Sequence, residues 1–181
     1  MAKRYPSISE AHQQFIERQK LFFVATSMPE GRLNLSPKGM DTLRVTGPDR
    51  VVWMNLTGSG NETAAHLRHD PRITLMFCAF DGAPMILRLY GTARALHQRD
   101  DGWNELAALF PEMTGARQFI EVEVDLVQSS CGSAVPLYDY VADRDGLAKW
   151  AEKRGREGVR RYWEERNLLS LDGVPTGVLD D

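Results

Sequence analysis

The feature that most constrains the fold of this chain is a short apolar strand, Val51–Met54, which stops at a glycine-rich turn and continues as a helix. The turn, residues 57–60 (TGSG), favours neither a strand nor a helix, and the helix is expected to begin near Asn61. The first turn of a helix has unpaired N–H groups and the positive end of the helix dipole. Two glycines let the backbone approach a ligand closely. The stretch therefore predicts a phosphate-sized anion site where a sheet meets a helix.

The same turn also has a purely structural interpretation. Ser59 is followed three residues later by Glu62, which is the pattern of a capping box. In a capping box the two side chains satisfy the free N–H groups without a ligand, and an inward-pointing Glu62 would repel a phosphate. The spacing matches neither a Walker loop nor a GxGxxG fingerprint. Both interpretations stay open at this point.

Most of the remaining chain is patterned as short strands joined by tight turns. Apolar residues occupy alternate positions in Arg32–Ser36 and Arg117–Ser130, as in half-buried strands. Pro37-Lys38-Gly39 is expected to end the first of these strands, and Gly91 is expected to form a bulge. Strands are predicted at 21–27, 32–36, 42–46, 51–54, 72–80, 85–96 and 117–130, with helices at 9–19, from 61 onward and at 100–110. Six or seven antiparallel strands predict a mainly β (α+β) fold built on a small closed barrel.

The composition changes from residue 143 onward. Two charged helical segments follow, with Gly155 or Gly158 between them, and their opposite charges are spaced as on a solvated helix face. The final residues, SLDGVPTGVLDD, are expected to be loose. We therefore predict a barrel domain at residues 1–142 and a charged helical extension at 143–181 that packs on it.

Composition excludes several classes of protein. With 181 residues and 43% apolar residues, the chain is expected to form one domain with one core. Its net charge of −3 argues against a nucleic-acid or anionic-membrane partner, since both need a concentrated basic face. The two cysteines are far apart, so no disulfide framework is indicated. No apolar leader or membrane-length run is present, and we expect a cytoplasmic protein.

Several motifs resemble the pyridoxamine 5'-phosphate oxidase-like family of flavin-binding split barrels. They are FFVATS…GRLNLSPKG, RVVWMNLTGSGNETAAHLRHDPRITLMF, ILRLYGTARAL and SCGSAVP, which together span about residues 15–140. The resemblance implies a six-stranded antiparallel split barrel with peripheral helices. It also implies a homodimer with flavin mononucleotide (FMN) in a cleft at the interface, and an oxidoreductase that passes electrons to a small-molecule substrate.

The resemblance further implies which positions hold the cofactor. Lys38 would face the flavin phosphate and Arg88 would lie beside the cofactor. The oxidases proper carry an Arg-Lys pair where this chain has Glu62 and Thr63, so the remaining cations would have to balance the phosphate. The full implied set is Ser36, Pro37 and Lys38 on one strand, Asn55, Leu56 and Thr57 at the end of another, Ser59, Gly60, Asn61 and Thr63 at the helix start, and Arg88.

Alternatives to this assignment come from the same residues. Flavin chemistry needs little acid–base help from the protein, so no side chain is identified as catalytic. His66 and His69, three residues apart on a helix, could share a metal but lack a third ligand, and we expect no metal. Trp53 fits the core better than flavin stacking, and Arg88 could instead form a surface ion pair. Haem or deazaflavin in the same fold, or a sensing module with an empty cleft, are the alternative functions.

Overall fold

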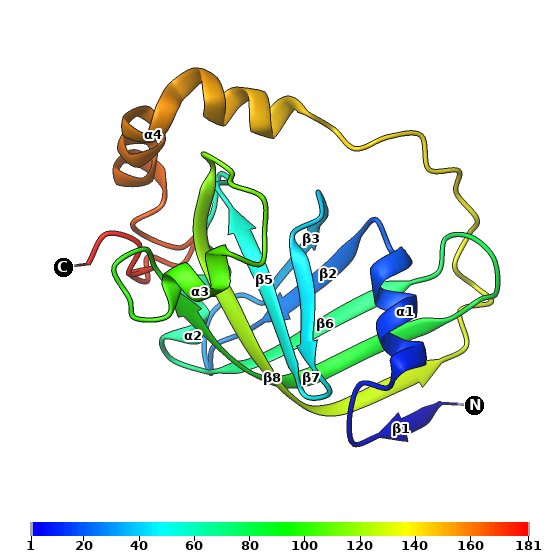
Figure 1. Ribbon diagram of the computed structural model, residues 1–181. Helices are drawn as coiled ribbons and strands as arrows, with labels where there is room; N and C mark the ends of the chain where they lie inside the picture. The colour runs from blue at the N-terminus through cyan, green and yellow to red at the C-terminus, as the bar shows by residue number, and fades with distance from the viewer. Residues whose placement is uncertain (1, 181) are drawn as a thin grey trace.

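The computed structural model describes residues 2–180 and shows one curved antiparallel sheet with helices around it (Figure 1). The sheet contains eight strands in the order β3-β2-β6-β7-β8-β5-β4, with β1 paired to β8. The strands are β1 (Lys3–Tyr5), β2 (Phe22–Thr26), β3 (Asn34–Lys38), β4 (Leu43–Gly47), β5 (Arg50–Leu56), β6 (Arg72–Cys78), β7 (Ile86–Leu96) and β8 (Ala116–Ser130). The helices are α1 (Glu10–Arg18), α2 (Glu62–Leu67), α3 (Trp103–Ala107) and α4 (Gly146–Arg166).

The arrangement confirms the predicted split-barrel fold class. The seven predicted strand segments are all present, and β1, which was not predicted, adds an eighth. The expected closure was wrong, because within residues 2–180 the end strands β3 and β4 do not pair with each other. The sheet is therefore open between these two strands, and this gap later bears on the site.

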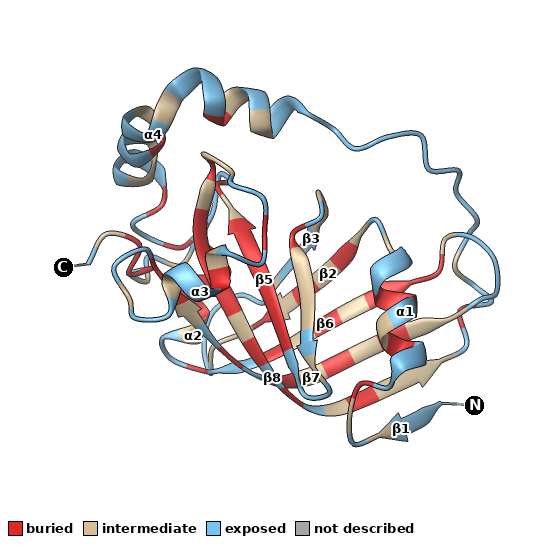
Figure 2. Cartoon of the chain, in the orientation of Figure 1, coloured by how far each residue is buried: buried red, intermediate tan, exposed pale blue. Residues whose placement is uncertain are grey.

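Strand β5 is buried on both faces, so it separates two apolar clusters (Figure 2). Val51 and Trp53 point inward to the main cluster, which α1 closes at one end with Phe15 and Ile16. Met54 points outward to a smaller cluster beneath α3. Full burial of such side chains stabilises a fold by about 1.5–3 kcal/mol each. A buried polar side chain on β5 is therefore exceptional.

Strand β3 continues through Pro37 and Lys38, where the sequence predicted an interruption. β3 is at the edge of the sheet, and an edge strand tolerates proline because the missing N–H can face away from the neighbouring strand. Pro37 is in register with Phe23 of β2, and Lys38 with Phe22. Lys38 consequently belongs to the strand, on the same face as Asn34.

Several local predictions about glycines and helix ends are settled by backbone geometry. The register shifts between Tyr90 and Gly91, which confirms the bulge, and a Cβ at Gly91 would lie 1.9 Å from the carbonyl oxygen of Glu123. Helix α4 is broken at Gly155 (φ 65°, ψ 174°), one of the two predicted positions. Helix α3 is shorter than predicted and begins after Gly102.

The C-terminal residues are packed, which contradicts the prediction of a loose end. Asn167, Thr176 and Val178 are buried, and the hydroxyl of Thr176 donates to the carbonyl of Asn167 at 2.5 Å. Arg32 forms an ion pair with Asp172, which ties this segment to the β2–β3 loop. The prediction failed because the contacts join residues that are far apart in the sequence.

Residues 131–145 connect β8 to α4 as a long arch, drawn in yellow to gold in Figure 1. Most of this strap is exposed, including Leu137, Tyr138 and Val141. No helix within residues 2–180 combines the length and apolar character that a membrane crossing requires.

Candidate functional site

The inner face of β3 carries polar side chains toward the interior of the barrel. Asn34, Ser36 and Lys38 alternate along it, and the Nζ atom of Lys38 lies 4.9 Å from the centre of the Trp53 ring. Burial, with a smaller contribution from the nearby positive charge of Arg117, lowers the pKa of Lys38 from 10.5 to about 8. No carboxylate of residues 2–180 forms an ion pair with Lys38. Its charge is therefore desolvated without compensation inside the chain.

Three buried amides lie together: Asn55 near the end of β5 and Gln118 near the start of β8, both on the inner face of the sheet, and Asn61 at the N-cap of α2. Asn55 is directly opposite Gln118, and the Nε2 atom of Gln118 donates to Oδ1 of Asn61 at 2.7 Å. Within the described chain Asn55 Oδ1, Asn61 Nδ2 and Gln118 Oε1 are buried without a hydrogen-bond partner. An unsatisfied buried polar group costs about 1–3 kcal/mol. A ligand offering both donors and acceptors would remove that cost.

The glycine-rich turn does not form the capping box. Helix α2 has only six residues, its N-cap is Asn61, and the Asn61 side chain makes no capping hydrogen bond. The carboxylate of Glu62 instead accepts the N–H of Leu171, at 3.1 Å from either oxygen. The structural interpretation was wrong because the C-terminal segment engages Glu62. Such a short helix also has a weak dipole, so the turn by itself is a poorer phosphate site than the sequence suggested.

The C-terminal half of α4 holds the outer side of the turn. The Nε1 atom of Trp163 donates to Thr57 Oγ1 at 2.9 Å, and Thr57 Oγ1 donates to the carbonyl of Gly115 at 2.9 Å. Asn167 Nδ2 donates to the carbonyl of Gly58 at 3.1 Å. These contacts fix the backbone that leads from β5 into α2.

Arg117 links the same turn to α4. Its Nη1 atom donates to the Gly60 carbonyl at 3.1 Å and to Asn167 Oδ1 at 2.6 Å. Sequence reasoning missed Arg117, Gln118 and Asn167. Gln118 could have been found from the sequence, because it is a polar residue at an alternating position that otherwise carries apolar residues such as Ile120. Asn167 had none.

The predicted site residues divide into two groups. Ser36, Lys38, Asn55, Asn61 and Thr63 lie toward the inner face, and Thr63 Oγ1 accepts from Asn34 at 3.1 Å. The others do not join them: Pro37, Ser59 and Gly60 are exposed, Leu56 lies on the outward face of β5, and Thr57 is held by Trp163.

Within one chain Arg88 lies on the outward face of the sheet, in register with Pro37 through Phe23 and Met76, and it is distant from Asn55. It is opposite Gln128, whereas Asn55 is opposite Gln118, ten residues earlier on β8 (128 − 118). Ten residues of strand correspond to about 33 Å. The Nη1 atom of Arg88 donates to Ser130 Oγ at 3.2 Å, and no ion pair of Arg88 occurs within residues 2–180.

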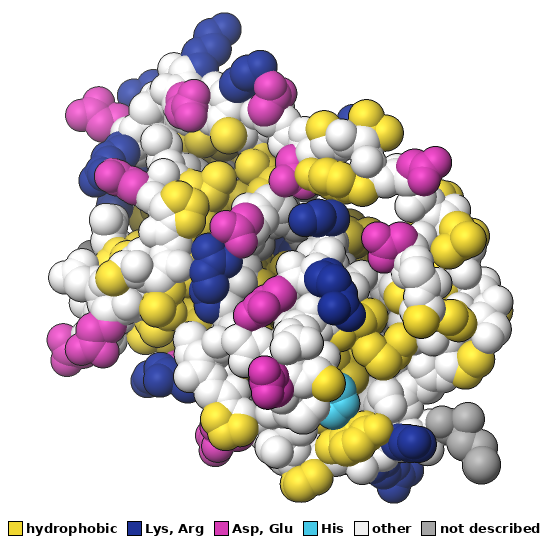
Figure 3. Space-filling model, turned by 45° about the vertical axis from the view of Figure 1, so that its right-hand side comes forward, with side chains coloured by type: hydrophobic (Ala, Val, Ile, Leu, Met, Phe, Trp, Pro, Cys, Tyr) yellow, Lys and Arg dark blue, Asp and Glu magenta, His cyan; other side chains and the backbone are white. Residues whose placement is uncertain are grey.

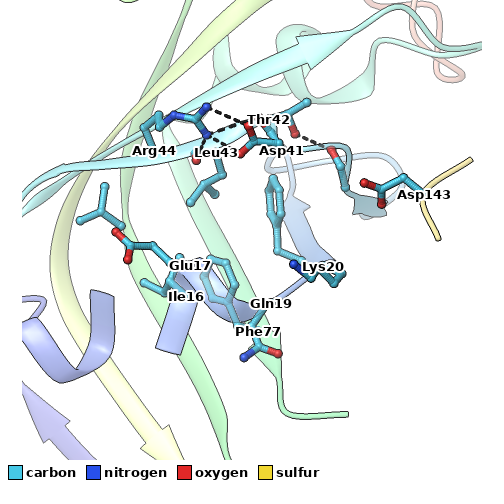
Figure 4. A pocket seen from close by; sticks show the side chains of 13 residues that line it. Ile16, Glu17, Gln19, Lys20, Asp41, Thr42, Leu43, Arg44, Phe77 and Asp143 are labelled. Atoms are coloured by element: carbon cyan, nitrogen blue, oxygen red, sulfur yellow. Dashed lines mark hydrogen bonds and ion pairs between the residues drawn. The ribbon is translucent and has the colours of Figure 1, made fainter. Parts of the chain in front are cut away.

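A pocket of about 420 Å³ opens near the gap between β3 and β4 (Figure 4). Phe22 and Phe77 contribute apolar surface, while charged residues from α1, the β3–β4 loop and the strap surround them. Phe22 packs edge-on against Trp53 at 6.1 Å, so the pocket shares an aromatic wall with Lys38. None of the eleven predicted residues lines it. The charged lining residues are Glu17, Lys20, Asp41, Arg44 and Asp143.

The two helical histidines do not converge on a metal site. His66 is buried and its Nδ1 atom lies 3.1 Å from Thr26 Oγ1, whereas His69 is exposed. Within residues 2–180 no group of three His, Cys, Asp or Glu side chains is placed to hold a metal.

Comparison with known proteins agrees with the geometry. The family model described as pyridoxamine 5'-phosphate oxidase matches residues 8–131. A pyridoxamine 5'-phosphate oxidase family protein of Aspergillus flavus, UstO, is 36% identical over 189 residues, covering 94% of this chain and 76% of that protein.

Two solved structures share the fold. A variant of HupZ from Group A Streptococcus has a TM-score of 0.53 at 18% identity, covering 68% of this chain and 99% of that one. A putative pyridoxamine 5'-phosphate oxidase from Lactobacillus delbrueckii has a TM-score of 0.53 at 14% identity, covering 68% and 94%. The family match and the fungal relative establish that this chain belongs to the pyridoxamine 5'-phosphate oxidase family.

Proposed function

We propose that the protein is an FMN-binding oxidoreductase that passes electrons to a small-molecule substrate. The observation that carries the proposal is Lys38, a desolvated cation on the inner face of the barrel without a carboxylate partner within the described chain. A phosphate dianion beside Lys38 would supply the missing opposite charge, and hydrogen bonds to charged groups contribute about 1.5–3 kcal/mol.

The unpartnered amides support the same ligand. A flavin ring presents carbonyl oxygens, ring nitrogens and one N–H along its polar edge. Asn61 Nδ2 can donate to a carbonyl oxygen or ring nitrogen of that edge, and Asn55 Oδ1 or Gln118 Oε1 can accept its single N–H. A bound flavin would supply the electron-transfer chemistry. The chain's residues would bind and orient it and keep water from the inner face.

The proposal includes a homodimer with the cofactor at the interface. β3 is an edge strand whose outward face exposes Leu35 (67%), and Leu33, directly before the strand, is 82% exposed. An exposed apolar edge strand favours association with another chain. Arg88 points away from the barrel interior, on the face of the sheet opposite to Lys38, so a role beside the cofactor would require a second copy.

The test begins with the absorbance spectrum of freshly purified protein. Flavin gives bands near ~370 and ~450 nm and haem a Soret band, because the cofactor carries the chromophore and the chemistry. FMN, FAD and riboflavin are then titrated into cofactor-free protein. We expect FMN to bind at least about tenfold more tightly than riboflavin, which lacks the phosphate. Haem in the purified protein, or equal affinity for FMN and riboflavin, would overturn the assignment.

Sedimentation tests the dimer. We expect a species of twice the 20.4 kDa chain mass at micromolar concentration. Mixed dimers of Arg88→Met and Lys38→Met chains address the shared site. If Arg88 acts across the interface, one of the two sites in such a dimer carries both substitutions and the other carries neither. A purely monomeric protein would exclude an interface cleft.

A further inference from the structure

A second cleft lies on the outer face of the sheet, beneath the C-terminal half of α4. It consists of two adjoining cavities of about 510 and 440 Å³, which share Gln98, Arg160 and Trp163 in their walls. Each cavity is within the range of about 300–1,000 Å³ that small-molecule sites occupy. In Figure 3, hydrophobic side chains lie in a hollow of the surface, with charged side chains around it.

One end of this outer cleft is aromatic. Trp103, Phe110 and Phe119 line it, with ring centres 4.5 Å apart for Trp103 and Phe119 and 5.5 Å for Phe110 and Phe119. Met54 and Met113 complete the wall. Large flat apolar surfaces of this kind favour planar aromatic ligands.

The other end is cationic. Arg117 is 3% exposed and His97 8% exposed, and both line this cavity. Within the described chain Arg117 Nε and His97 Nε2 are buried without a hydrogen-bond partner. Arg99 and Arg160 also line the wall, but each lies near a carboxylate, at 3.8 Å from Asp100 for Arg99 and 3.6 Å from Glu164 for Arg160, and Asp100 is also 3.5 Å from His97 Nδ1.

The carboxylate that lines the same end is already engaged. Asp180 forms an ion pair with Arg68 at 2.7 Å. Arg117 forms no ion pair within residues 2–180, and burial lowers its pKa to about 9. Burying a guanidinium away from water without an opposite charge beside it costs free energy. An anion bound in the outer cleft would correct this imbalance.

The outer cleft is distinct from the proposed flavin site because successive residues of a strand point to opposite faces. On β8, Gln118 points inward to Asn61, and Arg117 points outward to α4. On β5, Trp53 points inward beneath Lys38, and Met54 lines the outer cleft. The sheet itself therefore separates the two sites.

We propose that the outer cleft binds a small organic anion with a planar aromatic body. Arg117 and His97 hold its negatively charged group, and Trp103 and Phe119 contact its rings. This inference does not depend on the identity of the cofactor. The aromatic cavity would hold the rings of such a ligand, and the adjoining cationic cavity would hold its charged group.

The probe is 1-naphthyl phosphate, compared with 1-naphthol and with inorganic phosphate. The chain has four tryptophans, and their indole N–H signals report the site of binding by NMR. We expect 1-naphthyl phosphate to shift Trp103 and Trp163, which line the cleft, and to leave Trp53 and Trp150 in place. Naphthol and phosphate should each bind at least about tenfold more weakly. A shift of Trp53 alone would place the probe at the Lys38 site and overturn the inference, as would equal binding of naphthol.

Variants separate binding from folding. Arg117→Met should weaken binding by at least about tenfold. Because this substitution also removes buried hydrogen bonds that stabilise the fold, two milder substitutions in the cleft wall test the site independently. Arg160→Gln should weaken binding several-fold, whereas Arg161→Gln, its exposed neighbour outside the cleft wall, should not. Asp180→Asn removes the wall carboxylate and should tighten binding. No change in Arg160→Gln together with no change in Asp180→Asn would overturn the assignment.

Discussion

Replacing Lys38 with methionine should stabilise the cofactor-free protein. The pKa of Lys38 falls from 10.5 to about 8 on folding because burial disfavours its charge. That difference corresponds to about 3.4 kcal/mol, since one pKa unit is worth roughly 1.36 kcal/mol. Loss of the cation–π contact with Trp53 offsets about 1 kcal/mol of this gain. We therefore expect Lys38→Met to raise the free energy of unfolding by about 2 kcal/mol at pH 7.

The stability difference between wild type and Lys38→Met should depend on pH in a definite direction. Between about pH 8 and 10.5 Lys38 stays protonated in the unfolded chain but not in the folded one. The unfolded state then binds more protons, so wild-type stability rises with pH through this window relative to the variant. The advantage of Lys38→Met should thus shrink toward pH 10. Urea unfolding of both proteins at pH 7 and pH 10 measures it, with Lys149→Met on exposed α4 as the control. A variant less stable than wild type at pH 7, or a difference independent of pH, would refute the reasoning.

Three further predictions concern the same framework. FMN affinity should fall by about tenfold per pH unit above pH 8, because binding then requires Lys38 to take up a proton. Titration of FMN across pH 7–10 measures this dependence, and Lys38→Met should abolish it. Gly91→Ala should destabilise the fold by more than about 3 kcal/mol, since the new Cβ would meet the Glu123 carbonyl. Thermal unfolding checks this against Gly146→Ala, where a Cβ meets no atom within 4 Å. Asn167→Ala should cost about 1–3 kcal/mol because Arg117 loses its bond to Asn167 Oδ1 and the Gly58 carbonyl loses its bond from Asn167 Nδ2. An unchanged urea midpoint would contradict this.

Most of the fold could be predicted because strand periodicity is a local property. Seven of the eight strands follow from apolar alternation and turn residues, and Gly91 marked its bulge correctly. β3 was predicted to stop at Pro37 because local rules do not say that a strand lies at a sheet edge. The capping box at Ser59 failed for a related reason: Leu171, more than a hundred residues later, engages Glu62.

The site was less predictable than the fold. The resemblance pointed to Lys38 and Asn55, and burial and missing partners now give those residues a physical reason to bind a ligand. It did not point to Arg117 or Asn167, whose positions depend on how α4 returns to the sheet. Arg88 was assigned by its motif, but only the strand register shows that it lies on the outward face of the sheet, away from Asn55. Motifs place residues on elements, whereas the register decides which of them meet.

The two uncompensated cations, Lys38 and Arg117, are best understood together. Each is desolvated, each lowers stability in the absence of an anion, and the charge of Arg117 further disfavours the charge of Lys38. Methionine at position 38 would fill similar space without that cost, so stability alone gives no reason for the lysine there, whereas Arg117 also holds Asn167 and the Gly60 carbonyl by hydrogen bonds. A bound anion on each side of the sheet would explain both cations, and it leads to a prediction about how the two ligands affect each other. FMN at the inner site should leave the affinity of the outer cleft for 1-naphthyl phosphate unchanged or lower it by no more than a few-fold, because the bound phosphate cancels the attraction of Lys38 but leaves the contacts of Arg117 in place. Mutual exclusion of the two ligands would show that both anions compete for one site, and the separation by the sheet would then be wrong.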